Sequence, residues 1–289
     1  MNAEDPAADR RFATTLARGL SVLRAFRPED DGLGNAEIAA RTGLPRSTVS
    51  RLTFTLRALG YLGHARGGDE RYRPGPALLA LGNVAARAIT FVDVAAAPMQ
   101  ALADRTATLA VLAVRDDRKL LLARTWRPRG VASLWLEAGH RVPIARSSSG
   151  HALLAALDER GLAHLLGSGG TGEEGRSAPA DEEGDDALDA GRAAAIRESA
   201  RGQLRASGFV VADPARYFTT EIHAASVPFR TRELGEPVVF TCGATPADLP
   251  LERLRDEVGP ALRAAVDELA RLTGQVAANR FDEPEESVP

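Results

Sequence analysis

Apolar residues recur every three or four positions near the start of the chain, and this spacing predicts a helix with one buried face. The residues concerned are Leu16, Leu20, Leu23 and Phe26. A turn-rich segment follows, and Asn35 is expected to cap a short second helix that ends before a turn at Gly43.

A third helix is predicted from Pro45, because proline favours the first position of a helix. Its apolar side chains share one face, at Val49, Leu52, Leu56 and Leu59. Polar and basic side chains cover the other face, which leaves that face free for a partner. Residues 61–73 are expected to form two short strands around a Gly-Gly-Asp turn. This order of elements is typical of a winged helix-turn-helix, which we assign to residues 12–75.

The rest of the pattern predicts a linker helix and a mixed domain. Residues 76–91 are rich in Ala and Leu without a strong polar face, so we expect a helix buried between domains or between subunits. Strands and helices alternate irregularly over residues 92–275, which favours an α+β domain. Within it, residues 167–189 have few large apolar side chains and many acids, and we expect a disordered acidic insertion. Residues 276–289 form an acidic tail.

Charge is distributed unevenly along the chain. Residues 1–91 carry 13 Arg and 9 acidic residues, whereas residues 92–289 carry 23 basic and 30 acidic residues. Eight of those acids lie in residues 171–189. The N-terminal part can therefore face a polyanion, and the charge of the insertion is expected to weaken non-specific attraction to DNA.

Several classes of protein are disfavoured by the sequence. No apolar run approaches the roughly 18 residues that cross a membrane, and no secretory signal is visible, so we expect a cytoplasmic protein without a membrane partner. The single cysteine, Cys242, rules out an internal disulfide. The five histidines lack metal-ligand spacing and no phosphate-binding glycine motif is present, so we expect neither a metal nor a cofactor.

The third helix and the hairpin carry the candidate DNA contacts. A recognition helix needs small hydrogen-bonding and basic side chains near its N-terminus, where it enters the major groove. Double-stranded DNA is expected to be contacted by Arg46, Ser47, Thr48, Ser50 and Arg51 from the helix and by Arg66 and Arg71 from the wing. Phe54 lies on the same side, where it either touches a thymine methyl or is covered by another element.

These segments resemble the IclR family of bacterial transcriptional regulators. The resemblance is carried by LARGLSVLRAF, AEIAARTGLPRSTVSRL, LGYL and RYRPGPALLALG, and it continues in VDVAAAPMQALADRT and GHRVPIARSSSGHALLA. It implies a winged helix joined by a linker helix to a GAF-like domain that binds a small-molecule effector. It also implies a homodimer or homotetramer on a palindromic DNA operator.

The resemblance implies an effector pocket between the turn at Gly150 and the late strands. Carried over position by position, the pocket comprises Leu134, Leu136, Gly150, His151, Ala152, Asp213, Ile222, Phe240 and Cys242. Family members often carry small polar residues where this chain has Ile222 and Phe240. We therefore expect a small carboxylate or aromatic metabolite, with the apolar wall favouring an aromatic or aliphatic ligand over a two-carbon acid.

Two other functions stay open at this point. The second domain could serve only dimerisation, which would make the protein a constitutive DNA-binding dimer without an effector. It could also be an enzyme domain fused to a winged helix, with His151 or Cys242 as catalyst, although orienting partners for either are missing. A lone cysteine in the apolar run VVFTCG is typical of a core residue, so we expect no catalytic residue and favour a ligand-responsive regulator that represses or activates transcription.

Overall fold

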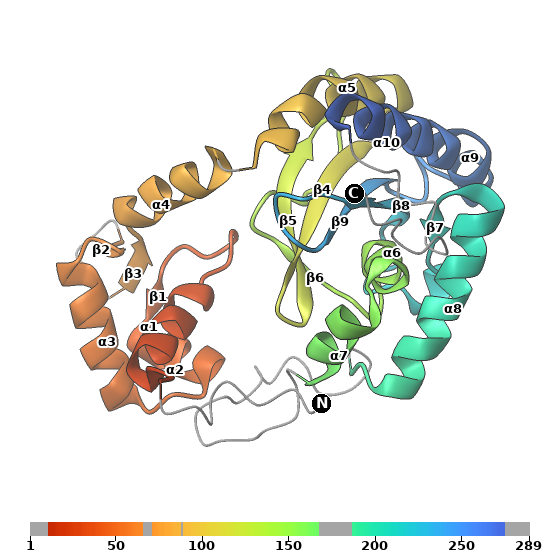
Figure 1. Ribbon diagram of the computed structural model, residues 1–289. Coiled ribbons are helices and arrows are strands. Elements are labelled where there is room, and N and C mark those ends of the chain that lie inside the picture. Colours follow the sequence, from red (N-terminus) through yellow and green to blue (C-terminus); the bar gives the residue numbers. More distant parts are fainter. Residues whose placement is uncertain (1–10, 66–70, 88, 168–186, 275–289) are drawn as a thin grey trace. The chain divides into compact units, whose positions relative to one another are not determined.

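The computed structural model describes four stretches of the chain, residues 11–65, 71–87, 89–167 and 187–274 (Figure 1). They fall into two compact units. The N-terminal unit holds the described residues up to residue 87, and the C-terminal unit begins at Ile89.

The N-terminal unit is a small helical domain with a three-stranded antiparallel sheet. Its described helices are α1 (Thr14–Arg24), α2 (Asn35–Thr42), α3 (Arg46–Ala58) and α4 (Pro76–Arg87). Its strands are β1 (Leu33–Gly34), β2 (Leu62–His64) and β3 (Arg71–Pro74), in the order β1-β3-β2. Gly43 joins α2 to α3 in a left-handed conformation, with a φ of 69°. The predicted winged helix-turn-helix is confirmed.

Two details of the α2 and α3 prediction are wrong. Gly34 caps α2, and Asn35 is instead its first helical residue, whose Oδ1 accepts a hydrogen bond from Thr53 Oγ1 at 3.0 Å. Thr53 is thereby buried on the packed face of α3. Leu59 lies beyond the last turn of α3, where it is 62% exposed.

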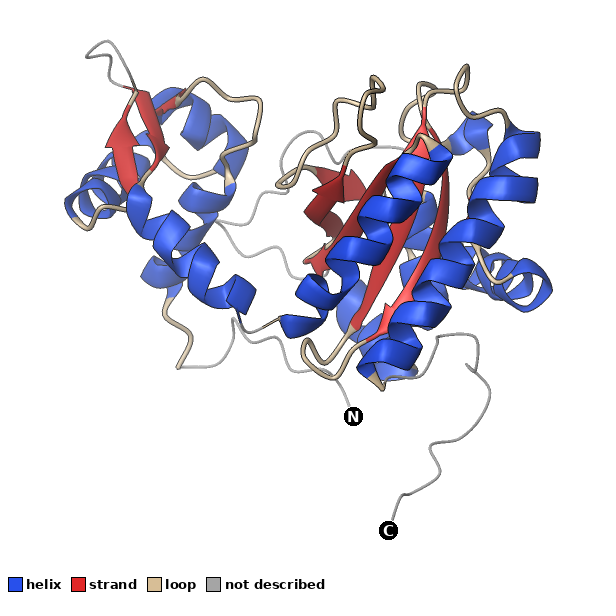
Figure 2. Ribbon diagram, turned by 90° about the horizontal axis from the view of Figure 1, so that it is seen from above, coloured by secondary structure: helices blue, strands red, loops and turns tan. Residues whose placement is uncertain are grey.

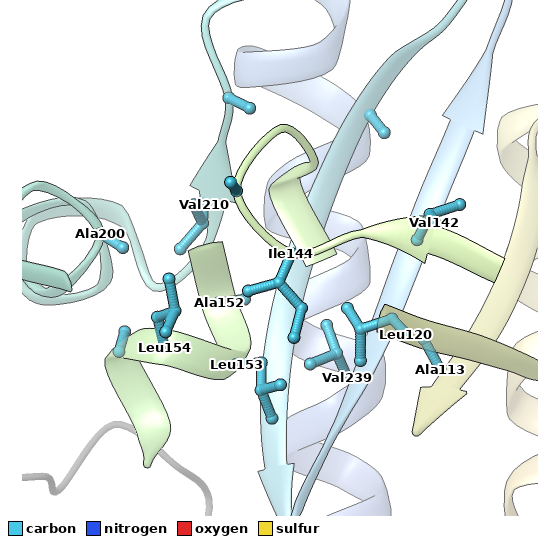
Figure 3. Close-up of a cluster of buried hydrophobic side chains, with 14 of the residues drawn as sticks. Ala113, Leu120, Val142, Ile144, Ala152, Leu153, Leu154, Ala200, Val210 and Val239 are labelled. Atoms are coloured by element: carbon cyan, nitrogen blue, oxygen red, sulfur yellow. The ribbon is translucent and has the colours of Figure 1, made fainter. Parts of the chain in front are cut away.

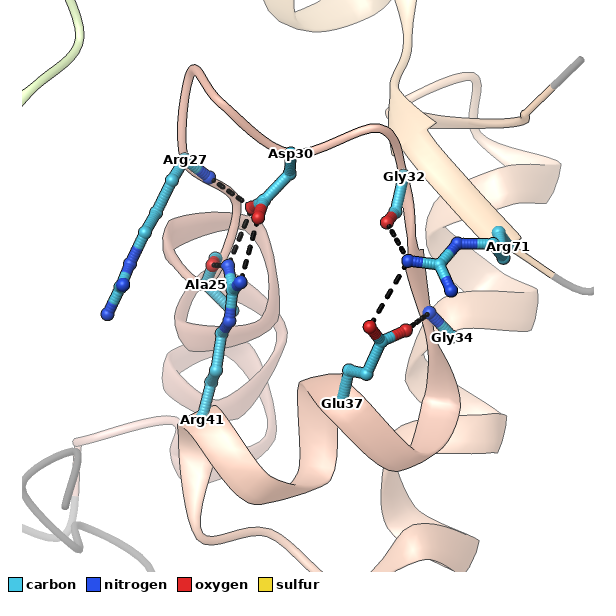
Figure 4. Close-up of polar contacts among 8 residues, drawn as sticks. All are labelled: Ala25, Arg27, Asp30, Gly32, Gly34, Glu37, Arg41 and Arg71. Carbon is cyan, nitrogen blue, oxygen red and sulfur yellow. Dashed lines mark hydrogen bonds and ion pairs between the residues drawn. The ribbon is translucent and has the colours of Figure 1, made fainter.

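An ion pair ties α2 to the segment that follows α1 (Figure 4). Arg41 donates to both carboxylate oxygens of Asp30, at 2.6 and 2.7 Å, and to the carbonyl of Ala25 at 2.8 Å. The backbone amide of Arg27 also donates to Asp30, at 2.7 Å. Burial alone would raise the pKa of Asp30, but these hydrogen bonds outweigh it and hold the pKa below the usual value of a carboxyl group.

We expect Asp30→Asn to lower the opening free energy of α1 and α2 at pH 7 by about 1 to 3 kcal/mol, because a charge-assisted network is lost. A carboxyl group whose pKa is lowered by folding stabilises the fold above its unfolded pKa and ceases to do so as pH falls through the folded value. The difference between Asp30→Asn and the unmodified protein should therefore shrink below about pH 4. Hydrogen exchange of the α1 and α2 amides at pH 7 and pH 3 measures it.

Asp31→Asn is the matched control. Asp31 pairs with Arg73, but its side chain is 92% exposed, so the pair is screened by solvent and should contribute little. An effect of Asp31→Asn as large as that of Asp30→Asn would contradict the role given to the Asp30 network.

The predicted linker helix over residues 76–91 is shorter in the structure. α4 ends at Arg87, and Phe91 lies in α5 (Thr90–Thr106), fully buried in the C-terminal unit. None of the residues of α4 is buried, and Leu79 and Val84 are each 69% exposed.

The C-terminal unit is built on a six-stranded antiparallel sheet with helices on both faces (Figure 2). In spatial order the strands are β6 (Arg141–Pro143), β5 (Lys119–Trp126), β4 (Leu109–Asp116), β9 (Pro237–Ala244), β8 (His223–Arg230) and β7 (Val210–Val211). The helices are α5, α6 (Ser148–Ala156), α7 (Glu159–Gly167), α8 (Ala190–Ser207), the short η3 (Pro214–Arg216), α9 (Leu251–Arg253), the π-helical turn η4 (Leu254–Val258) and α10 (Gly259–Thr273). The predicted GAF-like α+β arrangement is confirmed.

Alternation along the strands divides this unit into two cores. One core packs the sheet against α5 and α10 and includes Phe91, Leu112 and Phe240. The other packs the opposite face against α6 and α8, and Figure 3 shows part of it, where Leu153 of α6 approaches Val239 of β9. We call these the α10-side core and the α6-side core.

The ends of the predicted insertion at residues 167–189 are structured, which corrects its boundaries. Gly167 is the last residue of α7, and Leu188 packs in the α6-side core. Asp189 caps α8 by accepting a hydrogen bond from the amide of Arg192 at 2.8 Å. Residues 168–186 of the insertion and the predicted tail at residues 276–289 lie outside the described residues.

No single helix of the described chain combines the length and the apolar character needed to cross a membrane. α4 and α5 meet that criterion only when they are taken together, across the interval between Arg87 and Thr90.

Candidate functional site

The first candidate site is the exposed face of α3. Arg46, Ser47, Ser50 and Arg51 are exposed and Thr48 is half-buried. Helical spacing places Ser47 and Arg51 opposite Val49 and Thr53, both of which are completely buried, and places Arg46 and Ser50 at the edge of the buried face. We call the exposed residues of α3 from Arg46 to Phe54 the recognition face.

Phe54 belongs to this recognition face. It is 64% exposed, and the guanidinium carbon of Arg57 lies 6.0 Å from the centre of its ring. The alternative that another element of the described chain covers Phe54 is therefore wrong. An apolar ring between basic and hydroxyl side chains can contact a thymine methyl group.

Of the two arginines predicted to contact DNA from the wing, the structure describes Arg71. Arg71 Nη2 donates to the carbonyl of Gly32 at 2.7 Å and to Glu37 Oε1 at 3.1 Å (Figure 4). Glu37 in turn accepts from the amide of Gly34, and this hydrogen bond is the main cause that lowers its pKa. Arg71 thus ties β3 to the start of α2, and its side chain stays 41% exposed, so a DNA contact remains a prediction. Arg66 lies outside the described residues.

The second candidate site is a cavity of about 30 Å³ between the sheet, α6 and two connecting segments. Leu134, Leu136 and Ile222, which the sequence places in the effector pocket, lie in its wall. Arg127 holds the first of the connecting segments, because its guanidinium donates to the carbonyls of Leu134 and Leu136, at 2.5 and 2.8 Å.

Phe240 and Cys242 do not reach this cavity, so their assignment to the pocket is wrong. They alternate with Thr241 and Gly243 along β9, and only the latter two face the cavity. Phe240 and Cys242 face the α10-side core instead. Burial raises the pKa of the Cys242 thiol to about 12, so this thiol is a poor nucleophile at neutral pH.

His151 and Asp213 line a different feature, a groove of about 1150 Å³ along α8 and α10. The His151 Nε2 donates to the carbonyl of Ala145 at 3.0 Å, and burial lowers the pKa of its ring. Asp213 accepts from the amide of Ala215 at 3.0 Å and caps η3. The sequence-based pocket therefore combines residues from two separate places.

Gly150 and Ala152 are packing residues inside α6 rather than pocket walls. A side chain at Gly150 would collide with the backbone of Ile144, since its Cβ would lie 2.1 Å from the Ile144 carbonyl oxygen. Ala152 is fully buried in the α6-side core. Both allow α6 to lie close to its neighbours.

A chain of buried hydroxyls beside the cavity escaped the sequence analysis. Ser149 Oγ lies 3.0 Å from Thr241 Oγ1, which lies 2.8 Å from Ser226 Oγ. Ser226 donates to Ser148 Oγ at 2.9 Å, and the Tyr217 hydroxyl lies 3.5 Å from Ser148 Oγ. Ser149, Thr241 and Tyr217 also line the cavity. In the sequence, the feature that could have indicated this hydroxyl chain is Thr241, an isolated hydroxyl residue in the apolar run VVFTCG.

Polar contacts hold α6, which carries two of these hydroxyls, at both ends. Ser147 caps its N-terminus by accepting from the amide of Gly150 at 3.0 Å. Arginine side chains donate to three carbonyls at its C-terminal end, from Arg201 to Ala155, from Arg230 to Ala156 and from Arg197 to Leu157. Satisfied ends allow this nearly fully buried helix to sit against the sheet.

Comparisons with known proteins agree with this architecture. Residues 15–65 match the model of the IclR helix-turn-helix domain. The transcriptional regulator TsaQ1/TsaQ2 of Comamonas testosteroni is 28% identical over 257 residues, which cover 88% of this chain and 86% of that protein.

Solved structures extend the likeness over both units. An IclR family transcriptional regulator from Brucella abortus superposes with a TM-score of 0.71 and 30% identity, covering 93% of this chain and 96% of that chain. An IclR homologue from Microbacterium hydrocarbonoxydans, solved with 4-hydroxybenzoate, gives a TM-score of 0.61 at 21% identity over 89% of this chain and 99% of its own. The chain therefore belongs to the IclR family of transcriptional regulators.

Proposed function

We propose that the protein binds a specific double-stranded DNA operator in the cytoplasm and that a small molecule in the cavity changes this binding. The observation that carries the DNA part is the recognition face of α3. Its exposed hydroxyl and guanidinium groups stand on a helix whose other face is fixed by Val49 and Thr53. This arrangement suits direct readout in a major groove, with phosphates near the helix N-terminus.

We propose that the operator is bound by a homodimer. The described part of the N-terminal unit exposes apolar side chains on α1, at Leu16 and Leu20, and on α4, at Leu79, Leu81 and Val84. Exposed apolar side chains on two helices of a small unit favour a protein interface. A two-fold dimer would present two α3 helices to two half-sites of a palindrome, and two such dimers would make a homotetramer.

The cavity supports the effector part of the proposal. It is mostly apolar and carries a few hydroxyls, which is the usual character of a small-molecule site. The Microbacterium homologue, which has the same fold, was solved in complex with an aromatic molecule, 4-hydroxybenzoate. We infer that the effector shifts the population between DNA-binding and non-binding arrangements of the dimer.

Selection from a pool of random duplexes with the full-length protein tests the DNA function. We expect enrichment of a palindrome with half-sites about one or two helical turns apart, and nanomolar affinity by fluorescence anisotropy. A pool that shows no enrichment over several rounds, with a folded protein, would contradict the proposed function.

A further inference from the structure

We propose that the effector of the cavity is an uncharged molecule that donates a hydrogen bond from a hydroxyl group, such as a phenol or an alcohol. This inference rests on the proposed function, because it names the class of ligand for the same cavity. It is carried by the charge of the cavity wall, the direction of the buried hydroxyl hydrogen bonds and the contacts of the adjacent helix end.

The wall of the cavity is uncharged over the residues that the structure describes. Three of its lining residues carry hydroxyls, namely Ser149, Tyr217 and Thr241, and the other ten are apolar. A carboxylate moved into this wall would lose its hydration without gaining a cationic partner, which is strongly unfavourable.

The hydroxyl chain fixes where its protons point, because each hydroxyl has one proton to donate. Ser226 donates to Ser148, so its contact with Thr241 must be a hydrogen bond donated by Thr241. The single hydroxyl proton of Thr241 then forms the hydrogen bond to Ser226. The contact between Ser149 and Thr241 must therefore be donated by Ser149.

Ser149 and Thr241 consequently offer lone pairs, not protons, to a molecule in the cavity. A ligand hydroxyl can donate to them, whereas a carboxylate or an ether cannot. At the other end of the chain, Tyr217 can accept from Ser148 and give its own proton to the ligand. A phenol or alcohol oxygen is both donor and acceptor, and so matches this set of groups.

The N-terminus of α6 lies beside these hydroxyls and would by itself favour an anion. Protein oxygens already take two of its first-turn groups, since the Gly150 amide donates to Ser147 Oγ and the backbone of Ser148 bonds to Tyr217. Burial raises the pKa of Tyr217, so its hydroxyl keeps the proton at neutral pH. Protein oxygens thus compete with a ligand anion for this helix end.

The cavity must widen to take such a ligand, because about 30 Å³ holds roughly one water molecule. Five of its lining residues, Leu136 and Phe218 among them, lie in connecting segments rather than in strands or helices. These segments can shift while the sheet and α6 keep their pairing, so Ser149 of α6 and Thr241 of β9 stay in place, whereas Tyr217 moves with its segment.

Matched small molecules titrated into the full-length protein test the inference by calorimetry. Phenol, anisole and benzoate share an aromatic ring. Phenol can donate a hydrogen bond, anisole can only accept one, and benzoate is an anion. The alcohol 1-hexanol, methyl pentyl ether and hexanoate repeat this comparison on an aliphatic chain. We expect phenol or 1-hexanol to bind at least about tenfold more tightly than the ether and the acid of its series.

Two variants of Thr241 test whether this residue causes the preference for a hydroxyl compound over the ether. Thr241→Val should remove the advantage of the hydroxyl compound and leave ether binding unchanged, whereas Thr241→Ser should keep that advantage. Circular dichroism checks that both variants fold. If Thr241→Val does not fold, Ser149→Ala replaces it, because Ser149 ends the hydroxyl chain and its loss leaves Thr241 bonded to Ser226.

The possible outcomes separate this inference from the proposed function. Tighter binding of benzoate or hexanoate, abolished by the cavity-filling variant Leu136→Trp, would overturn the hydroxyl preference and leave an effector site standing. Equal binding of phenol and anisole would overturn it as well. Binding of none of the six molecules, by a protein that still binds its operator, would contradict both the inference and the effector part of the proposed function.

Discussion

Gly150→Ala is expected to lower the free energy of unfolding of the C-terminal unit by about 3 kcal/mol or more. The added Cβ would lie 2.1 Å from the carbonyl oxygen of Ile144 and 2.4 Å from its Cα. Both atoms belong to the backbone, so no side-chain rotation relieves the overlap, and α6 must move away from the segment that precedes it. Urea unfolding followed by tryptophan fluorescence measures the loss, because Trp126 and Trp135 both lie in this unit.

Gly202→Ala is the control for the same chemical change. Gly202 lies inside α8, and a Cβ at this position meets no atom within 4 Å. Alanine has the higher helix propensity, so this variant should be more stable by up to about 1 kcal/mol. Equal effects of the two substitutions would contradict the close approach of α6 to Ile144.

Local patterns explain why the N-terminal unit was predictable from the sequence. The apolar spacing of α1 and α3, the turn at Gly43 and the hairpin all lie within short stretches of chain, so each can be inferred without knowing its partner. The errors arose where a distant contact decides the outcome. Thr53 is buried on the packed face of α3, where Asn35, 18 residues earlier in the chain, accepts its hydrogen bond.

The cavity was only partly predictable, because it is assembled from segments far apart in the sequence. Leu134, Leu136 and Ile222 could be assigned from family resemblance, but the choice between Phe240 and Thr241 depends on which face of β9 meets α6. A shift of one residue in a strand exchanges the two faces. The run VVFTCG is buried on both faces, so its hydrophobicity does not indicate the direction, and the isolated hydroxyl of Thr241 is a better marker of the functional face.

Arg51→Ala is expected to weaken binding to the selected operator by about 1 to 3 kcal/mol for each half-site, if the guanidinium reads a base edge. Arg51 is exposed on the second turn of α3, beside Ser47 and Ser50, so its removal leaves no buried group without a partner. Stability should therefore stay unchanged while affinity falls. Fluorescence anisotropy with the operator and with a scrambled duplex, over a range of salt concentrations, measures the change.

The comparison of the two duplexes decides which atoms of DNA Arg51 contacts. A loss confined to the operator assigns it to a base, whereas an equal loss on both duplexes, with a salt slope reduced by about 1, assigns it to a phosphate. Arg160→Ala, which removes an exposed arginine from α7 in the other unit, should leave operator binding unchanged. An Arg51→Ala variant that binds the operator as tightly as the unmodified protein would contradict the placement of the α3 recognition face in the groove.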